Sequence, residues 1–135
     1  MARPMTTSRR DPTQIAIPAD PDRLDVLRLV VRNACARRGA SVDEIDDAAL
    51  AVHEASLALI DAGASRLELE LGGDEGELTV TIGSPAPIAL QREEGMSFRI
   101  IEAVAAGVEV SNGDGGTSIT LRLRVGGEPD PSATE

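Results

Sequence analysis

The side chains that could take part in chemistry are few in this sequence. Glu54 lies in a segment whose apolar residues recur at helical spacing, and His53 precedes it directly. A glutamate can act as a general base toward a hydroxyl group or a water molecule. A solvated or capping glutamate on a helix is the alternative, and the sequence leaves both open.

The chain has one histidine, His53, and one cysteine, Cys35. One thiol forms no disulfide within the chain and no CxxC motif, so we expect a reducing, cytoplasmic setting. We expect no metal site from histidine and cysteine, an ordinary, partly exposed His53, and a buried Cys35 that behaves as a small hydrophobic residue.

Composition excludes several functions. The chain of 135 residues contains no lysine and carries a net charge of −10, from 23 acidic and 13 basic residues. Chemistry that requires lysine, such as Schiff-base formation or a P-loop, is therefore excluded. Binding to nucleic acid or to an anionic membrane is disfavoured, whereas a basic protein partner suits the charge. We expect neither a membrane span nor a secretory signal, because no sufficiently long apolar run is present.

The strongest helix prediction covers 41–62. Ser41 and Glu44 form a capping box, the apolar residues that follow share one face, and Gly63 can end the helix in a left-handed conformation. Asp20 and Pro21 predict the start of an earlier helix, which we expect to reach about residue 38. A third helix is expected over 96–106, with Phe98 facing inward.

Alternating apolar residues predict the strands. These are expected over 14–17, 66–71, 78–82, 108–110 and 118–125, with hairpin turns over 72–76 and 112–116, the second at the Asn112-Gly113 pair. A sheet with one apolar face is covered on one side only. We therefore expect an α/β (α+β) two-layer sandwich: about five mostly antiparallel strands with three helices on one face. This domain spans 13–125, and 1–12 and 126–135 are expected to be disordered tails.

Three segments resemble a known family. They are LAVHEASLALIDAG (50–63), GMSFRIIEAVAAGVEV (95–110) and GGTSITLRL (115–123). In this order they resemble GHKL (histidine-kinase-like) ATPase domains. More closely, they resemble the anti-sigma-factor branch of bacterial serine-protein kinases, in a divergent actinobacterial subgroup.

The resemblance implies site residues. Glu54 matches the family's base, while Ala58 stands where an asparagine holds Mg²⁺, and a methyl group cannot ligate a hard cation. Ser84 stands at or near the aspartate that binds adenine. The resemblance implies nucleotide contacts at Gly95, Gly116 and Thr117, yet Ser97 and Phe98 replace the second glycine and the leucine of the family's lid. The hairpin alone would also explain the cluster Gly113, Gly115 and Gly116.

The resemblance implies a cytoplasmic regulator that binds a sigma factor of RNA polymerase, is released by an antagonist protein and forms a homodimer, without bound ATP or Mg²⁺. One alternative is an active serine-protein kinase that uses ATP and Mg²⁺ and phosphorylates the antagonist. Another is a partner-switching module that binds a different regulatory protein. We expect contact with neither nucleic acid nor a membrane.

Overall fold

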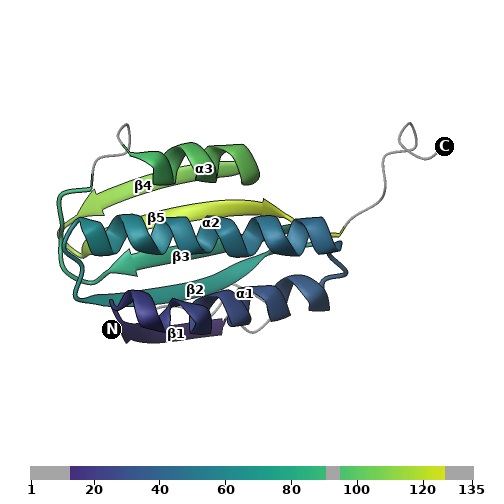
Figure 1. The fold of residues 1–135 in the computed structure, drawn as a ribbon, viewed down its shortest axis with the longest axis horizontal. Coiled ribbons are helices and arrows are strands. Elements are labelled where there is room, and N and C mark those ends of the chain that lie inside the picture. The colour runs from purple at the N-terminus through teal and green to yellow at the C-terminus, as the bar shows by residue number, and fades with distance from the viewer. Residues whose placement is uncertain (1–12, 91–94, 127–135) are drawn as a thin grey trace.

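The computed structural model describes residues 13–90 and 95–126. The tails expected at 1–12 and 126–135 lie outside this range, apart from Gly126. Five strands form one antiparallel sheet in the order β1-β2-β3-β5-β4, and three helices lie on one of its faces (Figure 1). The elements are β1 (Thr13–Pro18), a 3₁₀ turn (Pro21–Arg23), α1 (Leu24–Arg37), α2 (Val42–Asp61), β2 (Arg66–Asp74), β3 (Glu77–Ser84), α3 (Met96–Val104), β4 (Gly107–Gly113) and β5 (Gly116–Arg124). The expected two-layer fold is confirmed.

The central helix α2 has the capping box, the terminating glycine and the buried face that its sequence predicts. Ser41 Oγ accepts a hydrogen bond from Glu44 N at 3.1 Å, and Glu44 Oε1 accepts one from Ser41 N at 2.9 Å, so the capping box is complete. Gly63 follows the helix with a φ of 111°, as expected of a residue that ends it. Of the apolar residues expected to share the buried face of α2, Val52 and Leu59 are fully buried, whereas Leu50 is exposed.

The first helix begins in two stages. Asp20 caps the 3₁₀ turn by accepting from Asp22 N at 2.9 Å, and Pro21 opens that turn. The α-helical part starts only at Leu24. The expectation of one continuous helix from Pro21 was therefore wrong in its first turn, where the backbone is wound more tightly.

Both hairpin turns are tighter than expected. Because β2 continues through Gly72 and Gly73 to Asp74, the first turn is confined to Glu75-Gly76. Asn112 and Gly113 still pair with β5, so the second turn lies at Asp114-Gly115 rather than at Asn112-Gly113. In both hairpins the strand pairing continues into glycines, because the ladder hydrogen bonds join backbone groups that every residue except proline carries.

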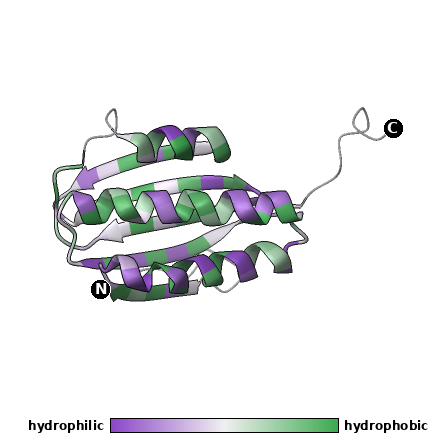
Figure 2. Ribbon diagram, in the orientation of Figure 1, coloured by the Kyte–Doolittle hydropathy of each residue, from purple (hydrophilic) through white to green (hydrophobic). Residues whose placement is uncertain are grey.

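The third helix ends earlier than predicted, at Val104. Ala105 already has extended backbone, and Ala106 N donates to Arg122 O at 2.8 Å, so the chain joins the sheet there. Phe98 and Ile101 are buried as expected. The helix is amphipathic, and Figure 2 shows both hydrophobic and hydrophilic residues along α3.

The core lies between the helices and the covered face of the sheet. Every second residue of the three middle strands points into it, as the alternation predicted. These are Leu67, Leu69, Leu71, Leu78, Val80, Ile82, Ile119, Leu121 and Leu123. Cys35 is also fully buried, and burial raises the pKa of its thiol to about 11, although Arg38 and Arg32 act in the opposite direction. This confirms that Cys35 is a buried core residue.

Candidate functional site

The candidate site lies at one end of the molecule, where the carboxyl end of β3, the start of β5 and the start of α3 come together (Figure 1). Glu54 faces α3 from the middle of α2. Its Oε1 accepts a hydrogen bond from Ser97 Oγ at 2.9 Å, and both residues are half-buried. The carboxylate that the sequence marks as a possible base is therefore bonded to a serine of the same chain.

Ala58 lies one helical turn after Glu54 and packs against the core. Residues four apart share a helix face, so a ligand at this position would have pointed the same way as Glu54. Its methyl group offers no oxygen to a cation. Within the described part of the chain, no three His, Cys, Asp or Glu side chains gather as potential metal ligands.

Ser84, at the last position of β3, is buried and bonded within its own turn. Its Oγ donates to Ala86 O at 2.7 Å and accepts from Ala86 N at 3.3 Å. A hydroxyl closed on the backbone two residues ahead is a local motif that stabilises turns. Both bonding directions of this side chain are used by the chain itself.

Thr117 is 1% exposed, and its side chain forms hydrogen bonds to the segment after β3. Its Oγ1 accepts from Ile88 N at 3.1 Å. The single hydroxyl proton can be donated to Ile88 O at 3.2 Å or to Asn112 Oδ1 at 3.0 Å. The loop after β3 is thus bound to the start of β5, and sequence reasoning missed the partner, Ile88, because it lies 29 residues away.

Two glycines complete the predicted set. Gly116 has a φ of 124°, and a Cβ built there would strike Ser84 O, so only glycine fits between β5 and the loop. Gly95 precedes α3 with a φ of 99° and open space around it. The structure therefore divides the predicted residues into two groups: Gly116 and Thr117 with Ser84, and Gly95 with Ser97 and Glu54.

His53 contacts the first helix instead of the site. Its Nδ1 lies 2.7 Å from Arg28 Nη1. A guanidinium group only donates, so Nδ1 accepts and the proton of the neutral ring is on Nε2. Arg32 pairs similarly with Asp46 at 3.0 Å, which joins α1 to α2. His53 is thus half-buried and structural.

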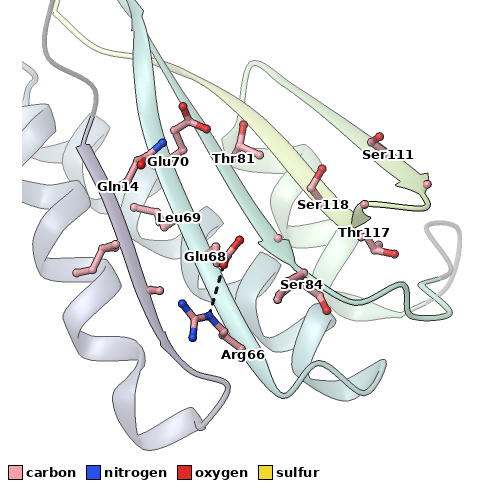
Figure 3. A pocket seen from close by; sticks show the side chains of 17 residues that line it. Gln14, Arg66, Glu68, Leu69, Glu70, Thr81, Ser84, Ser111, Thr117 and Ser118 are labelled. Carbon is pink, nitrogen blue, oxygen red and sulfur yellow. Dashed lines mark ion pairs between the residues drawn. The ribbon is translucent and has the colours of Figure 1, made fainter. Parts of the chain in front are cut away.

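A hollow of about 660 Å³ lies on the face of the sheet that the helices do not cover (Figure 3). Its lining includes Glu68, Glu70, Thr81 and Ser118. Sequence reasoning did not single out these residues, although their alternation with buried leucines and isoleucines already placed them on the outer face.

Comparison with known proteins agrees with the fold. The histidine kinase-like ATPase domain family matches residues 17–123, and the chain belongs to this family. A search of curated proteins gave no match.

Two solved structures share the architecture. One contains the RsbU and RsbW domains of a Mycobacterium tuberculosis protein, with 21% identity and a TM-score of 0.65 over 84% of this chain and 32% of that one. The other is the histidine kinase domain of a blue-light activated histidine kinase from Erythrobacter litoralis, with 19% identity and a TM-score of 0.54 over 81% and 62%. The chain thus spans about a third of the first protein and under two thirds of the second.

Proposed function

We propose that this chain is a cytoplasmic regulator of the anti-sigma type, which binds and sequesters a sigma factor of RNA polymerase and is released by an antagonist protein. The observation that carries the proposal is the hydrogen bond between Glu54 and Ser97. In the family that the sequence resembles, this glutamate serves an incoming hydroxyl group. Here the chain supplies the hydroxyl itself, while the scaffold around it is complete.

The other nucleotide positions support the same proposal. Ala58 provides no Mg²⁺ ligand, Ser84 is closed on its own turn, and Thr117 is bonded to the loop that follows β3. A nucleotide would have to break several of these contacts before it could bind, and a buried polar group that loses its partner costs about 1–3 kcal/mol. We therefore propose that neither Gly95 nor Gly116 contacts ATP, and that this protein acts by contact alone.

Calorimetric titration of ATP and ADP, with and without Mg²⁺, tests the nucleotide part. We expect no heat and no rise in melting temperature. The matched variant Ala58→Asn restores the family's ligand and should also fail while Ser84 and Thr117 hold the loop. Tight Mg²⁺-dependent binding by the unaltered chain would contradict the proposal.

A pull-down with every sigma factor of the source organism tests the partner. We expect one of them to be retained, and to be released when the antagonist is added. Retention of none would overturn the sigma-factor assignment. A different regulatory protein that purifies with the chain would instead favour the partner-switching alternative.

The active kinase is the second candidate, and retention of Glu54 is what favours it. This reading requires another ligand in place of Ala58 and release of Glu54 from Ser97. Labelled ATP should then transfer phosphate to a serine of the antagonist, and Glu54→Gln should abolish that transfer. Absence of transfer would dismiss this candidate.

We also propose that the chain forms a homodimer through β1 and α1. β1 is an edge strand, and a groove of about 930 Å³ beside it is lined by Thr13, Val30 and Leu29, which is 68% exposed. An edge strand next to exposed apolar surface favours association. Leu29→Glu should yield monomers in light scattering. Val42→Glu, at a residue 72% exposed on α2, is the control and should not.

A further inference from the structure

The uncovered face of the sheet carries one row of residues that crosses all five strands and begins at Gln14 on β1, which is opposite Glu70. Glu70 is opposite Thr81, Thr81 is opposite Thr120, and Thr120 is opposite Glu109. The two threonine hydroxyls are 3.3 Å apart. Neighbouring strands are about 4.8 Å apart, so the two glutamates, on β2 and β4, stand roughly 14 Å from one another.

The adjacent row forms the floor of the hollow. It contains Gly83, Ser118 and Ser111, which pair in register from β3 to β4. Gly83 has no side chain and the two serines are small, so a ligand can approach the backbone here. Figure 3 shows Ser118, Ser111 and Thr81 around this space, with Glu68 and Glu70 along β2.

The charges on this face do not cancel within the row. Arg66 is 3.4 Å from Glu68, and Arg122 is 4.0 Å from Glu77, so these four residues form two ion pairs. Neither Glu70 nor Glu109 belongs to an ion pair among residues 13–90 and 95–126. The row is therefore left with two negative charges.

Three kinds of occupant fit this surface poorly. An apolar helix would find hydroxyl groups and carboxylates instead of an apolar surface. A second copy of the chain would bring the same carboxylates together, and like charges oppose association. Nucleic acid would meet the same negative charge.

The geometry points to a docking surface for a basic segment of a protein partner, in which two cationic side chains reach Glu70 and Glu109 while polar groups between them meet Thr81, Thr120 and Ser118. This surface lies on the face opposite Glu54, so the inference stands apart from the proposed sigma-factor activity. Exposed charge pairs contribute little singly, and their number and spacing provide selectivity.

A synthetic peptide of alternating arginine and threonine is the probe, and the same peptide with citrulline in place of arginine is its neutral counterpart. Nuclear magnetic resonance with the full chain maps the contact. We expect the arginine peptide to shift the amide signals of Thr81, Gly83 and Ser118 and leave that of Glu54 unchanged. Signals that shift only on the helices, or equal binding of both peptides, would overturn the proposal.

The double variant Glu70→Gln/Glu109→Gln should weaken binding of the arginine peptide about tenfold and flatten its dependence on salt. The control Asp61→Asn/Glu75→Gln removes the same charge elsewhere and should bind like the unaltered chain. Equal weakening by both double variants would mean that net charge alone explains the binding, and it would overturn the proposal.

The chain's own arginines provide a further check. If the full chain binds the peptide only after Arg9→Ala/Arg10→Ala, its own N-terminal segment occupies the surface and a partner is not its occupant. Unchanged binding by this variant supports the partner. None of these results depends on whether a sigma factor is bound, so the two proposals can fail separately.

Discussion

The two faces of the sheet differ in side-chain composition and burial although they belong to the same strands. Leu121 is fully buried under the helices, and the preceding residue, Thr120, lies on the uncovered face. The covered face is almost entirely aliphatic, whereas the uncovered face carries hydroxyl groups and charges. Figure 2 shows the resulting change of hydropathy from residue to residue along the strands. The fold therefore constrains one face strongly, and the other is free to vary with the protein's interactions.

Two residues on the covered face of the sheet are polar rather than aliphatic. Ser84 and Thr117 are buried at 4% and 1% exposure, and both lie at the end of the sheet beside the loop that follows β3. Each has its hydrogen bonds satisfied within the chain. A buried polar group is tolerated only with such partners, so these residues now stabilise the loop after β3.

The largest expected effect separates the two faces directly. Leu121→Ala should lower the free energy of unfolding by about 2–5 kcal/mol, because it leaves a cavity in a close-packed core. Thr120→Ala, one residue earlier, should cost less than about 1 kcal/mol. Urea unfolding measures both, and similar losses would contradict the contrast between the faces.

The next effect concerns the glycines at the edge of the hollow. Gly116→Ala should destabilise the chain by about 2–3 kcal/mol, because φ is 124° and the new Cβ would strike Ser84 O. Gly115→Ala, with open space at its Cβ, is the matched control and should cost less. Equal losses in thermal unfolding would mean that the contact between β5 and the loop is unimportant.

A smaller effect is expected in the helix layer. Ser97→Ala removes the donor to Glu54 and should cost about 1 kcal/mol, with faster hydrogen exchange at the start of α3. Glu54→Gln keeps an acceptor oxygen and should cost less. Ser118→Ala, on the uncovered face, should leave α3 unchanged. Exchange at α3 that does not respond to Ser97→Ala would contradict the role of this hydrogen bond.

The smallest effect depends on pH. The Cys35 thiol has a pKa of about 11 in the folded chain and ordinarily about 9.0, so the unfolded chain loses its proton first as the pH rises. The stability contributed by the neutral thiol is therefore present below pH 9 and is lost as the pH rises toward 11. Between about pH 8 and 9.5, the free energy of unfolding should fall by about 1 kcal/mol or less. Cys35→Ala should remove this slope, and an identical slope in that variant would contradict the assignment.

Much of the fold was predictable because its signals are local. The capping box of α2 and the leucine alternation of β2 each involve residues within one element, and the structure confirms both. The same locality explains the errors: the sequence at Asn112-Gly113 suits a turn, but pairing with β5 extends the strand through Gly113. Cross-strand pairing overrides local turn preference.

The candidate site was predictable only in part. The resemblance to the family implied Glu54 as a possible base and Ala58 as a residue that replaces a metal ligand. The sequence could not reveal that Glu54 meets Ser97, 43 residues away, or that Thr117 holds Ile88. The row from Glu70 to Glu109 also required the strand order, since three separate pairings create it.

The sequence by itself therefore determined the helices, the strands and the side of each strand that is buried, because periodicity and capping act between near neighbours. Only the tertiary structure decided which hydroxyl groups meet Glu54 and Ile88, and which carboxylates share the uncovered face. Those contacts join residues that are distant in the chain, and their partners are chosen by how the sheet and the helices pack.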